Sequence, residues 1–326
     1  MIKIVRAVFI RRYGGVDVLE VGERPRPEPG PGQVLVEVHA AGVNPRDWLL
    51  REGRYQFRWL LPRFPIVLGS DVSGVVAGLG PGATRFSIGE AVFGMQTTLG
   101  RMGGYAEYVA MAESALARKP PSVSHQEAAA APCAALTAWQ SLHAIGRVAP
   151  GRRVTVAGAS GGVGTYAFQL ARAAGARITA VTSGPNVALA RELGAEVVVD
   201  YTEGPWTDRV RDQDVVLDAV GRTPFAAARA ALSGGGRYIT TVPRAATFAA
   251  AVSTRLLWGL TGCRWPRAHV VLVRASGADL ESIGALMATG GVRSVLDGVY
   301  PLEAVREAHA RSRTWRTRGK LVLRVR

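Results

Sequence analysis

The stretch Val154-Thr-Val-Ala-Gly158-Ala-Ser-Gly161-Gly-Val-Gly164 decides the fold of this chain. β-Branched and small residues lead into a glycine-rich turn, and a segment with helical periodicity, residues 165–175, follows it. In a strand–turn–helix of this kind, bare backbone N–H groups and the positive end of the helix dipole face an anion such as a pyrophosphate. One glycine makes the turn, one lets the backbone approach phosphate, and the last lets the helix pack closely on the strand. The stretch therefore predicts a dinucleotide-binding βαβ unit.

Strand and helix patterns continue to alternate after this turn. With the strand that precedes the turn, the expected strands number six, and strands that alternate with helices predict a doubly wound parallel sheet of the Rossmann type. The strands after the turn are expected at residues 177–182, 196–200, 214–220, 236–242 and 269–274.

The first 121 residues have a different pattern. They carry short β-like runs separated by Gly and Pro, for example at residues 34–40 and 105–110. Closely spaced β-runs predict a compact, partly open barrel rather than a parallel sheet. After residue 275 a helix, a strand, a second helix and a last strand follow, and we expect this tail to return to the barrel. The expected domains are therefore 1–121 with 276–326, and 122–275.

The composition is typical of a globular protein, with 48% hydrophobic and 20% charged residues in 326. No run approaches the roughly 18 apolar residues of a membrane span, and the N-terminus is too short and too charged for a signal peptide. The two cysteines are too few for a disulfide framework. These features predict a cytoplasmic protein with no membrane partner.

The net charge of +15 would suit an anionic partner. The arginines are scattered, however, and the dense cluster of basic residues lies near the C-terminus, from Arg311 to Lys320. No stretch interleaves aromatic with basic residues as a nucleic-acid stacking platform would. We therefore expect no nucleic-acid partner, although the field would attract an anionic cofactor.

Seven motifs follow one another along the chain. They are Ala41-Gly-Val-Asn44-Pro-Arg-Asp47, Leu68-Gly-Ser-Asp71-Val-Ser-Gly74-Val-Val, Gly103-Gly-Tyr-Ala-Glu107-Tyr-Val, Ala135-Leu-Thr137-Ala-Trp, Gly158-Ala-Ser-Gly-Gly-Val-Gly164, Leu193-Gly-Ala-Glu-Val-Val-Val-Asp200-Tyr201 and Arg318-Gly-Lys-Leu-Val-Leu. In this order they resemble the medium-chain dehydrogenase/reductase superfamily, in its zinc-free quinone oxidoreductase-like and enoyl reductase branches. The resemblance implies a GroES-like, partly open β-barrel catalytic domain with a Rossmann cofactor domain inserted into it.

The resemblance also bears on zinc. Zinc-dependent members of the superfamily place a Cys where this chain has Asn44, and a His-Glu pair where it has Ser70-Asp71. Cys133 falls where those relatives place another ligand. One thiolate does not make a catalytic zinc site, which needs three protein ligands and an open position. We therefore expect no metal, and we interpret Cys133 as a small buried hydrophobic residue.

The loop after the second strand of the βαβ unit bears on the choice of cofactor. NAD-preferring Rossmann folds carry an Asp or Glu about 20 residues after the glycine turn. This chain has the uncharged segment Thr182-Ser-Gly-Pro-Asn186 there, which favours NADPH. Relatives hold the 2′-phosphate with a Lys near Asn186, from which this chain departs, and with a Tyr that Tyr201 matches. Ser183 and Asn186 have an alternative role in turn and helix-cap chemistry. The expected cofactor-binding residues are Asn44, Thr137, Gly158, Ser160, Gly161, Gly162, Val163, Gly164, Thr182, Ser183, Asn186, Tyr201, Val220 and Arg318.

Without a metal, the reaction needs an electrophile that conjugation already activates, such as a quinone or a C=C beside a carbonyl. The segment from Asn44 to Tyr55 resembles an Asn-x-Arg-Asp…Gly-x-Tyr segment of the enoyl reductase branch. That likeness implies Asn44 near the nicotinamide and Tyr55 as hydrogen-bond donor or proton source to the developing oxyanion. Alternatively, Tyr55 only packs substrate, and Asp47 could cap or tether the loop. The expected reaction is hydride transfer from NADPH to a quinone or an α,β-unsaturated carbonyl.

Two other functions stay open. One is a reductase of specialised metabolism that acts on a polyketide-like intermediate, for which residues 248–266 could line an apolar pocket; they could equally form a dimer surface. The other is an NADPH-binding protein without turnover, in a regulatory or nucleic-acid-associated role. The resemblance also implies a homodimer, because in relatives the last strand of the sheet, here at His269, pairs with its twofold mate and hides an otherwise exposed apolar edge.

Overall fold

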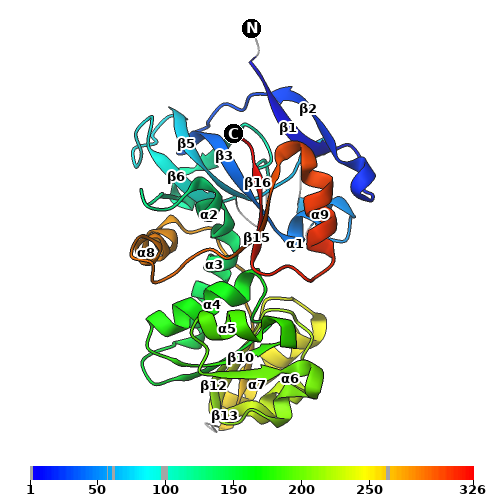
Figure 1. The fold of residues 1–326 in the computed structure, drawn as a ribbon, viewed down its shortest axis with the longest axis vertical. Coiled ribbons are helices and arrows are strands. Elements are labelled where there is room, and N and C mark those ends of the chain that lie inside the picture. The colour runs from blue at the N-terminus through cyan, green and yellow to red at the C-terminus, as the bar shows by residue number, and fades with distance from the viewer. Residues whose placement is uncertain (1–2, 57, 61–62, 97–101, 262–264) are drawn as a thin grey trace. The chain divides into compact units, whose positions relative to one another are not determined.

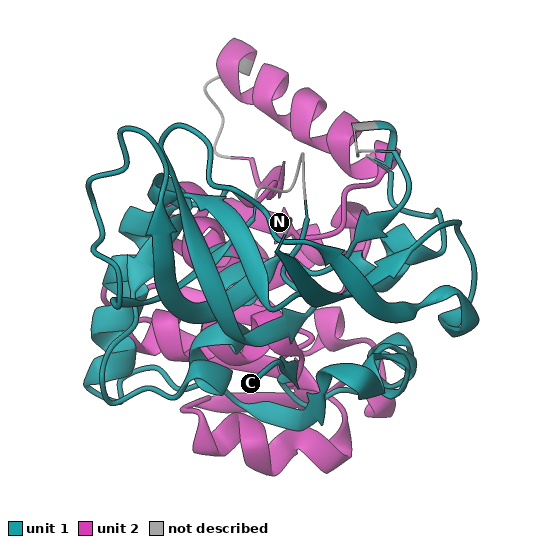
Figure 2. Ribbon diagram, turned by 90° about the horizontal axis from the view of Figure 1, so that it is seen from above, with its two compact units in different colours: residues 1–136, 274–326 teal, residues 137–273 magenta. Residues whose placement is uncertain are grey.

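The computed structural model describes residues 3–56, 58–60, 63–96, 102–261 and 265–326. The chain forms two compact units (Figures 1 and 2). Unit 1 consists of Met1–Leu136 with Arg274–Arg326, and unit 2 of Thr137–Val273.

Unit 1 is built on two sheets. In the smaller sheet β1 lies between β2 and β4, and both pairs are antiparallel. The larger sheet has the order β15-β16-β3-β5-β6-β8, with β7 also paired to β3. Val34, Val36 and Val38 of β3 are spaced two apart and all lie in the core, as expected for one face of a strand. The strands are β1 (Ile4–Ile10), β2 (Glu20–Pro25), β3 (Gln33–Val43), β4 (Ile66–Val67), β5 (Asp71–Leu79), β6 (Ala91–Met95), β7 (Tyr108–Ala112), β8 (Leu116–Arg118), β15 (Leu296–Pro301) and β16 (Lys320–Arg324).

The tail returns to this sheet as expected, because β16 pairs antiparallel with β3 and parallel with β15. The arrangement confirms the predicted GroES-like β domain. Its helices are α1 (Pro45–Arg51), α2 (His125–Ala130), the start of α3 (Pro132–Trp139), α8 (Gly277–Ala288) and α9 (Val305–Arg313).

The boundary between the units lies later than the expected residue 122. Helix α2 packs on β3 and β5, so residues 122–136 belong to unit 1. The close approach of α2 to β3 requires a glycine in the strand. A Cβ placed on Gly42 of β3 would lie 2.4 Å from the carbonyl oxygen of Ala129 in α2. Periodicity identified the helix, but only the contacts of its alanines decide which sheet it covers.

Unit 2 contains one parallel sheet with the order β11-β10-β9-β12-β13-β14. All six predicted strands are present, and the sheet has the expected doubly wound order. That order reverses between β9 and β12, and in such sheets ligands bind at the carboxyl ends of the strands beside the reversal. The strands are β9 (Arg153–Ala157), β10 (Arg177–Thr182), β11 (Val197–Asp200), β12 (Gln213–Asp218), β13 (Leu232–Thr240) and β14 (Arg267–Val270). The helices after α3 are α4 (Gly162–Ala173), α5 (Val187–Glu192), α6 (Phe225–Ala228) and α7 (Ala245–Thr261).

Among the described residues, no helix combines the length and the apolar character needed to cross a membrane.

Candidate functional site

The glycine turn has the geometry that a phosphate-binding loop needs. Gly158 has a φ of +82°, a conformation that side chains rarely adopt. A Cβ on Gly164 would lie 2.3 Å from the carbonyl oxygen of Gly158, so this glycine is what lets α4 approach β9. Gly161 has a different surrounding, because a Cβ there would meet only the Gly158 oxygen, at 3.4 Å.

Gly161 is also the N-cap of α4, and no side chain caps that helix end. The first turn of α4 contains no acidic residue. Backbone N–H groups and the helix dipole at this end are therefore available to an anion. Gly162 and Val163 open the helix, so the predicted run from Gly158 to Gly164 lies together at the carboxyl end of β9.

The predicted residues at the end of β10 join this turn. The Thr182 hydroxyl donates to the Ser160 hydroxyl over 3.3 Å, which ties β10 to the glycine turn. The Asn186 amide donates to the Ser183 hydroxyl over 3.1 Å. Tyr201 follows β11 and has an exposed side chain. The structure thus places these residues at the carboxyl ends of three neighbouring strands.

A carboxylate that the sequence reasoning did not consider lies against the same loop. Asp200 ends β11 and accepts hydrogen bonds from the Thr202 backbone and hydroxyl and from the Gly184 backbone. These bonds, those of Thr202 first, hold the pKa of Asp200 below its usual range, so the group is anionic at neutral pH. The loop at residues 182–186 is uncharged in sequence, but it has this anion beside it. In the sequence, the position of Asp200 directly before the predicted Tyr201 could have indicated this carboxylate near the cofactor loop.

A second carboxylate, this one buried, lies next to the loop that follows β12. Asp218 ends β12 and accepts from the backbone N–H groups of Val220, Gly221 and Thr223. It thereby fixes the loop that carries Val220, whose side chain lies where a Cβ on Gly158 would be. Sequence reasoning treated Asp218 only as part of a strand. A buried Asp at the carboxyl end of a parallel strand is the pattern that would have identified it.

Asn44 lies in a buried polar cluster of unit 1. Its side-chain amide donates to Asp71 Oδ2 over 3.0 Å and to Ser70 Oγ over 3.5 Å. Its carbonyl oxygen accepts from the Lys320 ammonium. Because both ends of the amide have partners within the cluster, its orientation is fixed.

The Lys320 ammonium is the cation of this cluster. Its Nζ lies 3.6 Å from Asp71 Oδ2 and donates to the Val43 carbonyl over 3.2 Å, and both charged side chains are buried. The Cys133 backbone N–H also donates to Asp71, over 3.2 Å. Desolvation, and next the Asp71 carboxylate, raise the pKa of the Cys133 thiol to about 12, so it is protonated at neutral pH.

Asp47 tethers the start of α1. Its Oδ2 accepts from the Asn44 backbone N–H over 2.8 Å and from the Tyr105 hydroxyl over 2.7 Å. Burial raises the pKa of Asp47 to about 6. The tethering alternative from the sequence analysis is the geometry observed.

Tyr55 lies at the border of the same cluster. Its half-buried ring packs against the core of unit 1, and the Arg46 guanidinium lies 5.3 Å from the ring centroid. The two side chains also share a hydrogen bond. Burial is the main cause that raises the pKa of Tyr55, so the phenol keeps its proton at neutral pH.

Two predicted residues remain, one in each unit. Thr137 is buried at the start of unit 2, in α3. Arg318 belongs to unit 1, where its backbone N–H donates to Asp297 over 3.0 Å and its side chain is exposed.

The comparisons with known proteins agree with this architecture. Residues 30–121 match the alcohol dehydrogenase GroES-like domain family, and residues 193–323 match the zinc-binding dehydrogenase family. The chloroplastic quinone-oxidoreductase QR1 of Triphysaria versicolor is 32% identical, over 98% of either chain. The human quinone oxidoreductase is 33% identical, over 94% of this chain and 93% of the relative. The solved quinone oxidoreductase of Coxiella burnetii has a TM-score of 0.89 and 30% identity, covering 99% of this chain and all of that one.

The chain belongs to the medium-chain dehydrogenase/reductase superfamily, in its quinone oxidoreductase-like branch. It is therefore an oxidoreductase by family, and the family binds a nicotinamide cofactor. The glycine turn of unit 2 fits such a cofactor, because Gly161 leaves the end of α4 open and uncapped.

Zinc does not fit the polar cluster of this oxidoreductase. A zinc site needs deprotonated N, S or O ligands. Here the Asn44 amide is committed to its neighbours, the Cys133 thiol keeps its proton, and the Lys320 ammonium lies beside Asp71. Among the described residues, no group of three or more His, Cys, Asp or Glu side chains could hold a metal ion.

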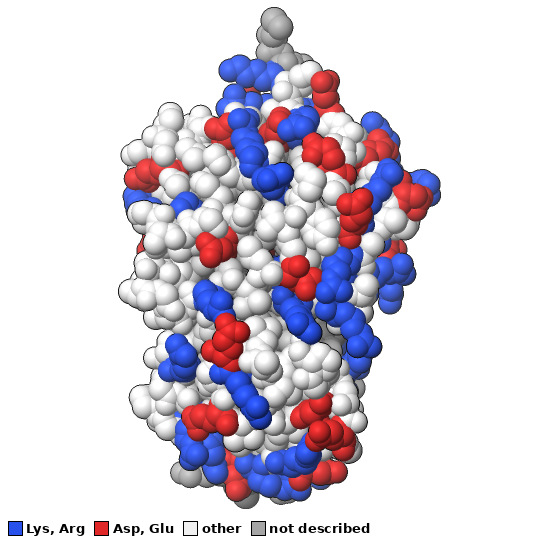
Figure 3. All heavy atoms as spheres, in the orientation of Figure 1, with Lys and Arg blue, Asp and Glu red and all other residues white. Residues whose placement is uncertain are grey.

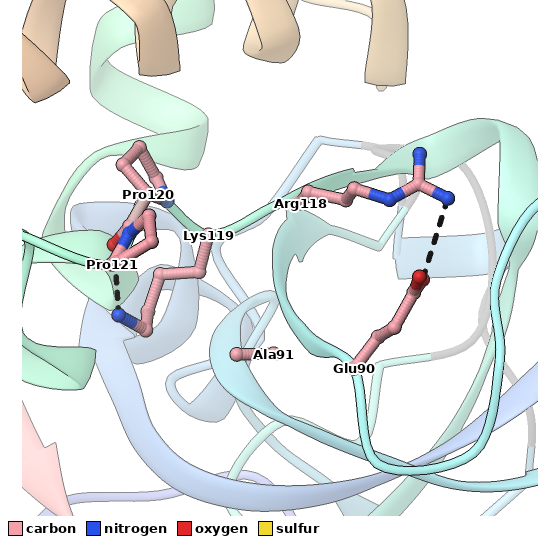
Figure 4. A pocket seen from close by; sticks show the side chains of 6 residues that line it. All are labelled: Glu90, Ala91, Arg118, Lys119, Pro120 and Pro121. Atoms are coloured by element: carbon pink, nitrogen blue, oxygen red, sulfur yellow. Dashed lines mark hydrogen bonds and ion pairs between the residues drawn. The ribbon is translucent and has the colours of Figure 1, made fainter.

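Two surface hollows are lined by residues other than the predicted site residues. One, of about 460 Å³, lies on unit 1 and is edged by the Arg118–Glu90 ion pair (3.4 Å) and by Lys119, which donates to the Pro120 carbonyl (Figure 4). The other, of about 300 Å³, lies in unit 2 beside the ends of β12 and β13, where Gly221, Thr240 and Arg244 line it. On the face drawn in Figure 3, basic and acidic side chains are interspersed.

Proposed function

We propose that this protein is an NADPH-dependent reductase without a catalytic metal, and that it transfers a hydride to a quinone or to the C=C of an α,β-unsaturated carbonyl. The proposal rests on an uncapped glycine turn in unit 2 that suits a pyrophosphate, together with a polar cluster in unit 1 whose residues do not suit zinc. Such a cluster can donate hydrogen bonds but has no Lewis acid, so the substrate must be activated by conjugation.

Unit 2 would hold the cofactor. The Gly158–Gly164 turn would bind the pyrophosphate through backbone N–H groups at the start of α4. Ser183, Asn186 and Tyr201 would donate to the 2′-phosphate, and Val220 would contact the nicotinamide end. Thr137, Ser160, Thr182, Asn44 and Arg318 complete the proposed set. When bound, the cofactor supplies the hydride.

Unit 1 would act on the substrate oxygen. Reduction adds one hydride and one proton, so charge develops on the quinone or carbonyl oxygen as the hydride arrives. Tyr55 holds its proton at neutral pH and can donate it, or a hydrogen bond, to that oxygen. Asn44 would have a positioning role near the nicotinamide, because Lys320 and Asp71 hold its side-chain amide in one orientation.

The test combines a substrate panel with one variant. We expect the purified protein to oxidise NADPH in the presence of quinones or enones, and to bind NADPH several-fold more tightly than NADH. Tyr55→Phe should lower kcat by about 10²–10³ and leave NADPH affinity unchanged, because it removes a single donor to the oxyanion. Tyr300→Phe, at another partly buried tyrosine of unit 1, is the matched control and should leave kcat unchanged.

Several results would contradict the proposal. No NADPH oxidation with any quinone or enone, together with tight nucleic-acid binding at physiological salt, would favour the non-catalytic binder. Turnover of only one bulky polyketide-like enone would favour the specialised reductase. A Tyr55→Phe variant with normal kcat and a raised KM would show that Tyr55 only packs against the substrate.

A further inference from the structure

Helix α7 of unit 2 has its large apolar side chains on the outside. Phe248, Val252, Leu256 and Leu260 are spaced four residues apart and so share one side of the helix, here called the outer face of α7. Their exposed fractions are 43%, 60%, 61% and 83%. Figure 2 shows α7 as the long magenta helix at the top of the view.

The opposite side of α7 is made of small residues. Ala250 and Ala251 pack against the core of unit 2. Thr254 is buried and accepts from the Ala268 backbone N–H on β14 over 3.2 Å. A helix that only covers a sheet places its large apolar residues inward and polar ones outward. In α7 the large apolar residues lie outward and small ones inward, so its outer face is suited to an apolar environment outside the chain.

The sequence around α7 contains basic residues and no acidic ones. From Ala219 to Ala278 it contains no Asp or Glu. The same segment contains eight arginines: Arg222, Arg229, Arg237, Arg244, Arg255, Arg264, Arg267 and Arg274. Residues 128–191 also lack Asp and Glu, but they carry six arginines in 64 positions, against eight in the 60 positions of the α7 segment.

Several of these arginines lie next to α7. The Arg267 guanidinium stacks over the Trp258 ring, 4.8 Å from its centroid. Arg255 is on α7 itself. Burial first, and next the charges of Arg267, Arg237 and Arg255, lower the pKa of His269 on β14 to about 4.

This combination distinguishes between possible occupants. A second copy docked through the same face would bring arginines against arginines, with no carboxylate in the segment to pair with them. A bilayer surface with anionic headgroups suits both properties, since it accepts an apolar helix face and attracts guanidinium groups. Trp258 and Trp265 are both exposed, and tryptophan is the residue most suited to the level of the headgroups.

We propose that α7 docks unit 2 onto the surface of a bilayer that contains anionic phospholipid. Phe248, Val252, Leu256 and Leu260 would enter the boundary of the acyl chains, and Arg255 and Arg267 would lie among the headgroups. The helix lies on the bilayer and does not cross it, in agreement with the absence of a spanning helix in the described part of the chain. The expectation of no membrane partner rested on the lack of a spanning segment and of a signal peptide. Surface binding requires one apolar face and a basic surround.

Vesicle co-sedimentation of the full chain tests this proposal. We expect binding to vesicles of phosphatidylglycerol mixed with phosphatidylcholine, and weak binding to phosphatidylcholine alone or at high salt. Leu256→Glu should weaken binding by at least about tenfold, because it puts a charge into the acyl boundary. Arg255→Gln should weaken it by about fivefold. Ile88→Glu, at an exposed apolar residue of unit 1, is the matched control and should bind as the parent does.

The outcomes are separable from misfolding and from self-association. Val252→Glu replaces Leu256→Glu if thermal melting shows that the latter is unfolded. The proposal fails if the parent does not sediment with anionic vesicles, or if both glutamate variants sediment as the parent does. It also fails if light scattering shows that Leu256→Glu converts a dimer into a monomer while the parent binds no vesicles, since the outer face would then belong to a second copy.

Discussion

Lys320 shows what one buried charge contributes to this fold. Its ammonium bonds to Asn44 and Val43 and lies beside Asp71, all of which are far from it in sequence. The role of such a cation is to compensate a buried carboxylate and to fix a neutral amide. Removing one member of a buried pair leaves the other charge uncompensated, which costs far more than the pair itself contributes.

We therefore predict that Lys320→Met lowers the free energy of unfolding by about 3–5 kcal/mol. Asp71→Asn in the Lys320→Met background should restore most of that loss, because no buried charge then remains. Urea unfolding of the two single variants and the double variant measures the coupling. Arg118→Met, in an exposed ion pair, is the control and should cost at most about 1 kcal/mol. Strictly additive losses in the double variant would show that the two charges are not coupled.

Asp47 makes the stability depend on pH. Burial is the main cause that raises its pKa from 3.8 to about 6. The folded chain therefore holds this proton more tightly than the unfolded chain. The stability that the protonated group contributes is complete below the unfolded pKa and is lost as the pH rises through about 6.

We expect Asp47→Asn to remove this dependence. The melting temperature of the variant, relative to the parent, should rise between pH 4 and pH 7, which scanning fluorimetry at several pH values would measure. Asp297→Asn is a control of opposite sign. Burial opposes the shift there, but hydrogen bonds from Arg311 and Arg318 hold the pKa of Asp297 below its usual range. That variant should therefore lose most stability at neutral pH. A flat difference for Asp47→Asn would mean that Asp47 is ionised without cost.

At the scale of elements, the turn between β9 and α4 separates two kinds of glycine. Gly161 has an ordinary φ of −80° and open space around it, whereas Gly164 has backbone oxygens within 2.6 Å of its missing Cβ. A side chain at Gly161 therefore affects what binds to the turn, and a side chain at Gly164 affects whether the helix can pack.

We predict that Gly161→Asp abolishes NADPH binding without lowering the melting temperature, since Asp is a favourable N-cap but repels a pyrophosphate. Gly161→Asn caps equally well without the charge and should keep most of the affinity. Gly164→Ala should lower the melting temperature, because its Cβ would collide with Gly158. Fluorescence titration and thermal melting separate these effects. Equal affinities for the Asp and Asn variants would show that no anion binds at this helix end.

At the scale of the whole molecule, the free edge of β14 is the feature that concerns assembly. β14 is the last strand of its sheet. The Val271 N–H donates to Thr240 on β13, so by strand alternation the Val270 N–H points away from β13. An edge of this kind pairs readily with another strand, and a twofold pairing closes the assembly as a dimer.

We expect light scattering to give twice the 34.5 kDa chain mass for the parent. Val270→Pro should give the monomer mass, because it removes the outward N–H while β13 stays paired. Leu256→Glu on α7 should remain dimeric, which distinguishes the edge from the outer face of α7. If light scattering gives the mass of a single chain for the parent protein, the dimer proposal is wrong.

Local chemistry explains how much the sequence revealed. Strand periodicity, glycine spacing and helix length act over a few neighbouring residues, so the six parallel strands, the glycine turn and a β-rich first domain could be predicted from the residues, and the resemblance identified that domain as GroES-like. Asn44 and Tyr55 were named as site residues through the likeness of one short segment to the family. Their roles stay predictions.

Tertiary structure decided what depends on distant partners. The Lys320 bond to Asn44 joins residues 276 positions apart, and the approach of Asp200 to Gly184 depends on the pairing of β10 with β11. The assignment of α2 to unit 1 and the outward side chains of α7 likewise depend on which surface each helix covers. A sequence pattern shows that a helix or strand has an apolar side. It does not say what lies opposite that side, because burial and charge pairing arise only when separate segments pack together.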